Sequence, residues 1–374
     1  MSAPARSPIR FLTSAQGWPY VLTPFIVLAV ALELAHASPT LIFAAAAIGI
    51  VPTAALMGLA TEELAARSGP GIGGLLNVTF GNAPELIIAL FALNAGLQEV
   101  VKASIVGSII GNILLVLGGA MLVGGIGREH QTFNSKAANI QSLMLFLAAA
   151  ALIMPAIFEL VEGRGLPSPG AEIVDYGGDV EGLSVAVALV LIGTYGAGLL
   201  FSLKTHRDLF NPPYEDEEDT MGWSVRRSVI LLAVAGVAVG VMSEILVGAI
   251  AETSETVGLS EFFIGVIVVA IVGNAAEHWV AVLVAYKNKM DLAVNISIGS
   301  SAQIALFVGP LLVLASFVIG PQPMALVFNG FELGAVLIAI FIAQIVTHEG
   351  ESNWFEGVQL LAVYAVLALA FFFA

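Results

Sequence analysis

Long apolar runs follow one another along most of the chain, separated by short polar breaks. A helix needs about 20 apolar residues to cross a bilayer core, and by this measure the sequence predicts eleven transmembrane helices. Their ranges are 19–35, 41–64, 72–94, 99–124, 138–158, 183–203, 227–250, 258–285, 291–317, 323–346 and 355–373. Turn-forming residues mark the breaks, for example at Ser68-Gly69-Pro70-Gly71 and Gly320-Pro321. Because the runs lack the alternation of membrane β-barrel strands, we expect an all-α polytopic membrane protein.

The basic residues indicate how the chain is inserted. If the connections alternate between the two sides of the membrane, 11 of the 13 Lys and Arg residues fall on the side of the N-terminus. Only Lys102 and Arg164 fall on the other side. Positive residues favour the cytoplasm, so we expect the N-terminus inside and the C-terminus outside. No organellar targeting segment is recognisable, which favours a bacterial inner (plasma) membrane.

The first apolar run has an alternative interpretation. Arg6 and Arg10, the apolar run and then Ala35-His36-Ala37 resemble a secretory signal with a cleavage site. Glu33 is out of place in the core of such a signal. Cleavage there would leave the ten later helices unchanged.

Composition excludes whole classes of function. Apolar residues make up 58% of the chain and charged residues 11%, against about 45–50% and about 25% in soluble domains. A soluble enzyme is therefore excluded, and the lipid bilayer is the expected partner. The 28 acidic and 13 basic residues leave a net charge of −15, which disfavours nucleic acid as a partner and suits a protein that handles cations. There is no Cys, so thiolate chemistry is absent.

The chain contains an internal repeat. Gly81-Asn82-Ala83-Pro84-Glu85 recurs 192 positions later as Gly273-Asn274-Ala275-Ala276-Glu277, and Gly107-Ser108 recurs as Gly299-Ser300. The repeat divides the chain into an N-terminal segment with a leading helix (1–40), a first five-helix repeat (41–203), a linker (204–226) and a second five-helix repeat (227–374). Because five is odd, the two repeats are expected to be inverted in the membrane. Inverted repeats are common in transporters, although channels also contain repeats.

Each motif places a glutamate near the middle of its predicted helix. A carboxylate there costs roughly 2.5–3.5 kcal/mol or more, and no Lys or Arg lies in the core of any predicted span. Gly81 and Pro84 predict an interruption of the first helix, and Gly273 predicts a looser second helix. Freed carbonyls, Asn oxygens and carboxylates are the ligands that calcium selects. The residues Ser108, Ser300 and Gln303 could add further oxygens or hydrogen bonds.

The spacing and the charge of these residues suggest a mechanism. Asn82 and Glu85, like Asn274 and Glu277, are three residues apart and share one helix face. Two ionised glutamates in a low dielectric repel each other, so the pair is stable with one divalent cation or with two protons. Such a site would exchange one divalent cation for two protons. Two alternatives remain: acids paired with buried bases, and Asn residues that only join helices by hydrogen bonds.

The sequence resembles the calcium/cation–proton antiporters of the cation/calcium exchanger superfamily. The resemblance covers nearly the whole chain and is carried by residues 60–64 (ATEEL), 73–87 (GGLLNVTFGNAPELI), 272–278 (VGNAAEH), 298–306 (IGSSAQIAL) and 350–357 (GESNWFEG). It implies Glu85 and Glu277 as cation and proton ligands. It also implies Asn82, Asn274, Ser108, Ser300 and Gln303 as members or supports of the site.

The resemblance implies roles for other residues as well. His278 corresponds to a position used for transport and could relay protons, whereas a lone membrane His is otherwise a packing residue. Four acids are implied as access or gating groups: Glu62, Glu63, Glu252 and Glu255. Ordinary solvated helix ends are the alternative.

The acidic run 215–219 is either a cation sensor or a solvated linker. The acidic connection 159–182 either attracts cations or only remains soluble. Glu244 and Glu332 are further candidates for a proton path.

These expectations combine into one functional prediction. The chain is predicted to be a Ca²⁺/H⁺ antiporter that expels Ca²⁺ from the cytoplasm by alternating access, with at least two protons per calcium. It needs no cofactor, because Ca²⁺ and H⁺ are its transported ions. A Na⁺/H⁺ or K⁺/H⁺ antiporter of the same fold is the nearest alternative, and a passive cation channel is another. An intramembrane enzyme is disfavoured because no His-Glu-x-x-His motif is present. The sequence does not indicate an oligomeric state.

Overall fold

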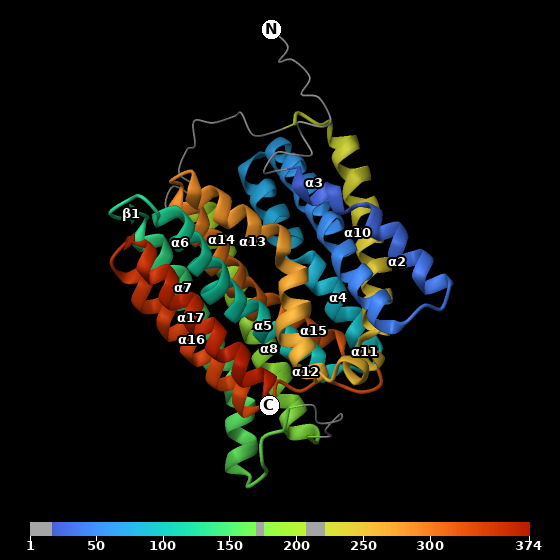
Figure 1. The fold of residues 1–374 in the computed structure, drawn as a ribbon. Coiled ribbons are helices and arrows are strands. Elements are labelled where there is room, and N and C mark those ends of the chain that lie inside the picture. Colours follow the sequence, from blue (N-terminus) through green and yellow to red (C-terminus); the bar gives the residue numbers. More distant parts are fainter. Residues whose placement is uncertain (1–16, 170–175, 207–220) are drawn as a thin grey trace.

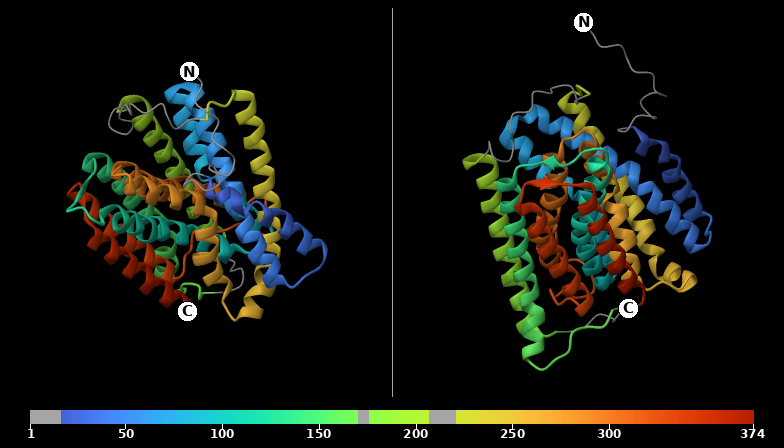
Figure 2. Two further views of the ribbon diagram at one scale, coloured as in Figure 1. Left: turned by 45° about the horizontal axis from the view of Figure 1, so that its top comes forward. Right: turned by 60° about the vertical axis from the view of Figure 1, so that its left-hand side comes forward.

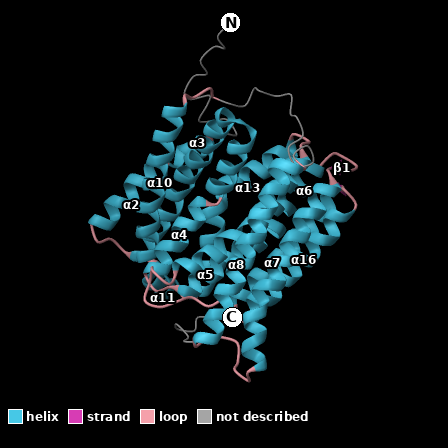
Figure 3. Ribbon diagram, turned by 180° about the vertical axis from the view of Figure 1, so that it is seen from behind, coloured by secondary structure: helices cyan, strands magenta, loops and turns pink. Residues whose placement is uncertain are grey.

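The protein is almost entirely helical in a computed structural model that describes residues 17–169, 176–206 and 221–374 (Figures 1 and 3). Within these residues, nine helices are long and apolar enough to cross a membrane: Pro39–Ser68, Gln98–Gly125, Ser135–Val161, Gly178–Thr205, Val225–Gly248, Glu261–Tyr286, Met290–Ala315, Gly330–His348 and Trp354–Phe372. A bent pair, Leu75–Gly81 with Ala83–Asn94, forms a tenth candidate, and Trp18–Leu34 is a shorter apolar helix. The chain is therefore an all-helical membrane protein.

Several of these spans are divided by local irregularities. In chain order the described elements are η1 (Trp18–Leu22), α2 (Pro24–Leu34), α3 (Pro39–Gly81), α4 (Ala83–Asn94), α5 (Gln98–Ile110), η2 (Gly111–Val116), α6 (Leu117–Gly125), β1 (Gln131–Thr132), α7 (Ser135–Val161), α8 (Gly178–Leu200), η3 (Phe201–Thr205), α10 (Val225–Gly248), α11 (Ile250–Val257), α12 (Glu261–Phe263), η5 (Ile264–Val269), α13 (Ala270–Tyr286), α14 (Met290–Gln303), η6 (Ile304–Val308), α15 (Gly309–Ala315), α16 (Gly330–His348), β2 (Glu351–Ser352) and α17 (Trp354–Phe372). The segments η2, η3, η5 and η6 are π-helical turns.

The helix α3 covers two predicted spans but does not run straight. A Cβ added at Gly73 would lie 2.5 Å from the carbonyl oxygen of Ala65. Eight residues of straight helix would separate these positions by about 12 Å. The chain therefore folds back between them, at the Gly- and Pro-containing break predicted from the sequence.

The helices that carry the repeated motifs lie in the middle of the bundle (Figure 2). On one side α3 packs against α2 and α10, and on the other α7 packs against α16 and α6 against α17. Glycines allow close contact in the middle: a Cβ at Gly107 of α5 would lie 2.0 Å from the carbonyl oxygen of Val266 in η5. Small residues serve this purpose in membrane helix packing. The packing therefore brings α4, α5, α13 and α14 together around one point.

One predicted span begins later than expected. The range 323–346 was predicted as helix, but α16 starts at Gly330 and residues 324–329 form an extended segment that is fully buried. Side chains from other helices bind its backbone: Ser184 accepts from Leu326 N–H at 3.0 Å, and Lys102 Nζ donates to Val327 O at 2.9 Å. Irregular backbone at this depth is tolerated only where protein groups satisfy it. Apolar composition alone could not distinguish such a segment from a helix.

Lys102, which the sequence places near the start of a predicted span, is only 2% exposed. Its ammonium forms an ion pair with Glu99 and lies 6.0 Å from the centre of the Tyr176 ring. Arg164, the other basic residue assigned to this side, donates to Tyr176 O at 3.0 Å. The two exceptions to the basic-residue pattern therefore lie together.

The opposite end of the bundle joins several connections. Arg128 donates to Tyr286 O at 3.1 Å and Gln131 donates to Ala285 O at 3.0 Å, which ties the connection after α6 to the turn between α13 and α14. At this end β1 pairs antiparallel with β2, with Gln131 opposite Ser352. Figure 1 shows β1 and the α13–α14 turn at one end, and α11, α12 and the end of α17 at the other.

Candidate functional site

The first motif lies at a break between two helices. The helix α3 ends at Gly81 and α4 begins at Ala83, and the axis of the last segment of α3, Leu75–Gly81, differs by 41° from that of α4. The interruption predicted at this motif is present. Asn82 occupies the N-cap position of α4, but its side chain caps no backbone N–H. Glu85 stands in the first turn of α4, where the helix dipole favours a negative charge.

The second motif differs from the prediction. Gly273 does not interrupt its helix, because α13 runs unbroken from Ala270 to Tyr286. The irregularity lies one turn earlier, in the π-helical segment η5. The missing side chain at Gly273 serves close packing instead of bending: a Cβ there would lie 3.3 Å from Cγ of Glu85. A pattern of single residues could not distinguish these two uses of glycine.

The two motifs face each other reciprocally. Gly273 lies beside Glu85, and a Cβ at Gly81 would lie 3.6 Å from Oε1 of Glu277. Each glutamate therefore stands against the glycine of the opposite motif. The two carboxylates also interact electrostatically, and both line one cavity.

Hydrogen bonds connect the predicted site residues across four helices. Asn82 Nδ2 donates to Gln303 Oε1 at 2.6 Å, and Asn274 Nδ2 donates to Ser108 Oγ at 3.1 Å. Ser300 Oγ donates to Glu277 Oε2 at 2.9 Å. These bonds join six of the seven predicted residues, and Glu85 lines the same cavity as Glu277. Both Asn side chains use an N–H group to bind a neighbouring helix.

This arrangement leaves acceptor oxygens free. Among the seven predicted site residues, three buried atoms have no hydrogen-bond partner in the described part of the chain: Asn82 Oδ1, Asn274 Oδ1 and Glu85 Oε2. Buried acceptors are rarely left unsatisfied, and carboxylate and amide oxygens are the ligands of hard cations. Among the described residues no group of three or more His, Asp or Glu side chains is arranged to hold a metal ion. A cation at this site would therefore depend on two carboxylates together with amide oxygens.

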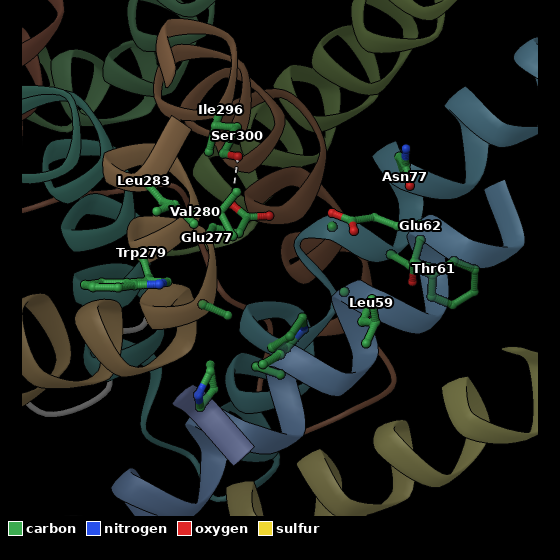
Figure 4. A pocket seen from close by; sticks show the side chains of 18 of the residues that line it. Leu59, Thr61, Glu62, Asn77, Glu277, Trp279, Val280, Leu283, Ile296 and Ser300 are labelled. Carbon is green, nitrogen blue, oxygen red and sulfur yellow. Dashed lines mark hydrogen bonds between the residues drawn. The ribbon is translucent and has the colours of Figure 1, made fainter. Parts of the chain in front are cut away.

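Two cavities reach the site from the same end of the bundle. The larger has a volume of about 390 Å³ and is lined by both glutamates, Glu62 and Lys287. Figure 4 shows Glu62 across this cavity from Glu277, whose carboxylate is bonded to Ser300. The second cavity, of about 340 Å³, is lined by both apolar and polar uncharged residues, and it also reaches Glu277 and Ser300. Water therefore has access to Glu277 from this end.

The structure separates the four acids predicted as access groups. Glu62 lines the larger cavity. Its neighbour Glu63 is 2% exposed and accepts from the backbone N–H groups of Met221 and Trp223, the latter at 2.8 Å, so it holds the start of α10. Glu252 and Glu255 are exposed on α11 and line neither cavity.

His278 also lies apart from the cavities. Its Nε2 is 3.2 Å from Oδ1 of Asn112 in η2, and it lines neither cavity. On a helix, successive residues point about 100° apart, so His278 faces a different neighbour from Glu277.

Parts of the acidic segments lie outside the described residues. These are the run 215–219 and, in the outer connection, Glu172 and Asp175. Of the same connection, Glu159 is 2% exposed and forms an ion pair with Arg164 at 3.3 Å. Glu159 is therefore a buried structural acid and does not attract cations from solvent.

Several residues of the site were not singled out from the sequence. Asn77 lines both cavities, and Gln141 and Asn295 line the second one, joined by a hydrogen bond of 2.5 Å. Asn112 holds His278. Each is a polar residue inside an apolar run, which is the signal that could have identified it.

The apolar bundle and the paired carboxylates between its halves define a membrane ion-transport protein. A family model described as "Sodium/calcium exchanger protein" matches residues 38–204 and 227–373, and the chain belongs to this family.

The similarity to individual relatives covers most of each chain. The "Ca(2+)/H(+) antiporter" of Synechocystis sp. is 45% identical over 93% of this chain and 97% of its own length. The "Ca(2+)/H(+) antiporter ChaA" of Bacillus subtilis is 43% identical, with 91% and 94% covered. A crystal structure of the selenium-substituted Ca²⁺/H⁺ antiporter protein YfkE superposes with a TM-score of 0.80 at 40% identity, covering 95% of this chain and 99% of that one.

Proposed function

We propose that the chain is a Ca²⁺/H⁺ antiporter that exports Ca²⁺ from the cytoplasm by alternating access. The observation that carries this proposal is the pair of glutamates, one from each half, that face each other beside unpartnered amide oxygens in a water-accessible cavity. The relatives named Ca²⁺/H⁺ antiporters, at 43–45% identity, support the choice of ions.

The site chemistry follows from charge balance. Ca²⁺ takes six to eight oxygen ligands. Glu85, Glu277, Asn82 and Asn274 would supply them together with water, while Ser108, Ser300 and Gln303 orient these side chains by the hydrogen bonds described above. When Ca²⁺ leaves, two protons restore neutrality, because two bare carboxylates in a low dielectric repel each other. At least two protons per calcium therefore follow.

The proposed topology has eleven transmembrane helices: a leading helix and two inverted five-helix repeats. Both the amino-acid sequence and the order of the helices support this topology. The series α5–η2–α6 and α14–η6–α15 share the order helix, π-turn, helix, and they start 192 residues apart at Gln98 and Met290. The reciprocal placement of Gly81 and Gly273 is a second sign of the repeat. The leading segment, η1 with α2, packs against α3.

The proposed location is a bacterial inner membrane, with the N-terminus in the cytoplasm and the C-terminus outside. The end of the bundle that holds most of the basic residues would then be cytoplasmic. Both large cavities open at that end, next to Met221 and Lys287 in one case and Ser202 in the other. The conformation is therefore the inward-open state, ready to receive cytoplasmic Ca²⁺.

Different roles follow for the peripheral residues. Glu62 attracts cations into the cavity, and Glu63 anchors α10. His278 fixes the rotation of α13 through Asn112. Glu252 and Glu255 lie at the outer surface, where they would meet the released ion.

Proton-driven ⁴⁵Ca²⁺ uptake into everted vesicles tests the proposal. Glu85→Gln and Glu277→Gln should each abolish uptake, whereas the exposed acid variant Glu349→Gln is the matched control and should retain it. Size-exclusion profiles in detergent verify that the variants are folded. Retained uptake in either site variant would refute the site. Proton counter-transport with Na⁺ or K⁺ in place of Ca²⁺, or Ca²⁺ flux without proton movement, would refute the assigned ion or the antiport mechanism.

A further inference from the structure

The side of the site opposite the open cavities is closed. In the described part of the chain, a void of about 10 Å³ lies there, against Glu85, Ser104 and Ser108. Its other lining residues are apolar: Ile88, Ala89, Ile105, Val269, Ala270, Ile304 and Val308. An ion bound between the glutamates cannot leave in this direction without movement of the helices.

The internal repeat relates this void to the open cavity. The residues that line the open cavity include Asn77, Glu277, Val280, Ile296 and Ser300 (Figure 4). Shifted by 192 positions, they become Val269, Glu85, Ile88, Ser104 and Ser108. All five of these counterparts line the small void. The void therefore occupies, in the opposite half, the place that the cavity occupies in the open half.

We infer that this void is the collapsed outer access path and that Ser104 and Thr253 line it when it opens. This inference rests on the proposed function, because an antiporter must open to both sides in turn. Thr253 is the counterpart of Thr61, which lines the open cavity. Thr253 is 3% exposed, and its Oγ1 has no hydrogen-bond partner in the described part of the chain. Water in an opened outer path would supply that partner.

The two paths differ in fixed charge. The counterpart of Glu62 is Ser254, and the counterpart of Lys287 is Ala95. Apart from the central glutamates, the outer path therefore lacks the ionisable residues that line the inner cavity. Between the central glutamates and the outer surface, a leaving cation passes no carboxylate at the position that corresponds to Glu62, and it meets Glu252 and Glu255 only at the surface. A cation that arrives from the cytoplasm meets Glu62 inside the cavity. This difference favours capture on the inner side and release on the outer side.

Cysteine labelling tests the path directly, because the natural chain has no Cys. We would make Ser104→Cys and Thr253→Cys for the outer path and Gly58→Cys for the inner cavity, where an added Cβ meets nothing within 4 Å. Ser142→Cys is the matched control, since Ser142 is 0% exposed and bonded to Thr347 away from both paths. A membrane-impermeant methanethiosulfonate cation is applied to one face of oriented vesicles at a time, with Ca²⁺, with protons or with neither.

The expected result is reciprocal labelling. Ser104→Cys and Thr253→Cys should react only from the outer face, and Gly58→Cys only from the inner face. The ion condition that speeds one reaction at least tenfold should slow the other, and Ser142→Cys should remain unreacted. If Ser104→Cys is inactive, Thr253→Cys carries the test. Outer residues that stay unlabelled under every condition, in variants that still transport, would overturn the inference.

Adding a carboxylate to the outer path tests the difference in charge between the two paths. Ser254→Glu gives the outer path the carboxylate that Glu62 provides inside, so external Ca²⁺ should inhibit export at a several-fold lower concentration. An unchanged inhibition curve would overturn the assigned difference in charge. Labelling does not depend on which ion is carried. Failure of Ca²⁺/H⁺ exchange in the natural protein would therefore refute the proposed function and leave the labelling result standing.

Discussion

The two copies of the motif have nearly the same sequence but are used differently. In the first copy the chain breaks at Asn82, and Glu85 begins a new helix. In the second copy the helix is continuous, and Glu277 lies well inside it. Glu277 receives a hydrogen bond from Ser300 and lines both cavities, whereas Glu85 has an oxygen without a partner and lies against Gly273.

This difference shows what one state of an exchanger requires. Glu277 lines both cavities and accepts a hydrogen bond from a hydroxyl, whereas Glu85 lines only the larger cavity and packs against Gly273 of the opposite helix. If the repeat exchanges these roles in the other state, Ser108 would donate to Glu85 as Ser300 now donates to Glu277. The difference between Glu85 and Glu277 would then arise from the conformation and not from the sequence. Equivalent substitutions at the two positions should therefore have unequal effects.

The largest effect is expected from shortening the glutamates. Glu85→Asp should lower exchange about 100-fold, which is the size of penalty that a misplacement of about 1 Å can cause, because Gly273 and Ile88 leave no room for adjustment. Glu277→Asp should cost about tenfold, since water in the cavities can fill the gap. Ca²⁺-dependent proton flux in proteoliposomes measures both. Equal losses of exchange rate in the two variants would contradict the inferred difference between the surroundings of Glu85 and Glu277.

Removal of the serine hydroxyls should have the next largest effect. Ser300→Ala takes a donor from a charged carboxylate, a bond worth about 1.5–3 kcal/mol, so the apparent Ca²⁺ affinity should fall at least tenfold. Ser108→Ala removes a bond between neutral groups, worth about 0.5–1.5 kcal/mol, and should cost about threefold. The Ca²⁺ dependence of initial rates at fixed pH checks this order. The reverse order would indicate that the outward-open state dominates in the membrane.

The paired glycines should produce a smaller difference. Gly273→Ala places a methyl group 3.3 Å from Glu85 Cγ, and Gly81→Ala places one 3.6 Å from Glu277 Oε1. Because packed interiors respond to a single added methyl group, Gly273→Ala should lower Ca²⁺ affinity severalfold. Gly81→Ala, at ordinary contact distance, should change it less than twofold. Calcium titrations of the two purified variants provide the measurement.

The smallest effect on transport concerns the adjacent acids. Glu62→Gln should raise the Ca²⁺ concentration for half-maximal rate about two- to fourfold at low salt, and this effect should fade as choline chloride screens the charge. Glu63→Gln should leave that concentration unchanged. It should instead lower the thermal stability, because the buried acceptor of two backbone N–H groups is weakened. A salt-independent effect of Glu62→Gln would argue against long-range attraction.

The sequence predicted the all-helical fold and the group of polar residues that the packing brings together, because both follow from strong physical constraints. That these residues bind ions stays a prediction. Apolar runs must cross the membrane, and a central carboxylate is too costly without a purpose. The break at Gly81 was predicted correctly and the loosening at Gly273 was not, since a glycine serves bending and close packing equally well. Glu62 and Glu63 could not be distinguished either, because their separation depends on which helix face meets the start of α10.

Other features depend on contacts between distant residues. Lys102 and the extended segment 324–329 look like a helix end and a helix when each is read alone, and only their mutual contact explains both. The polar residues Asn77 and Gln141 became part of the site only through the packing of α3, α7 and α14. Such long-range pairings are not encoded in any local pattern.

The extended segment has a consequence for how the protein is made. Its amides are bound by Lys102, which was synthesised 225 residues before its partner Val327, and by Ser184. Until those helices have gathered, the emerging segment would expose unsatisfied backbone to lipid, which is strongly unfavourable. The last part of the nascent chain must therefore wait at the insertion machinery or near the surface until the earlier helices have assembled. A ribosome-stalled intermediate that ends near residue 340 would reveal this order of assembly.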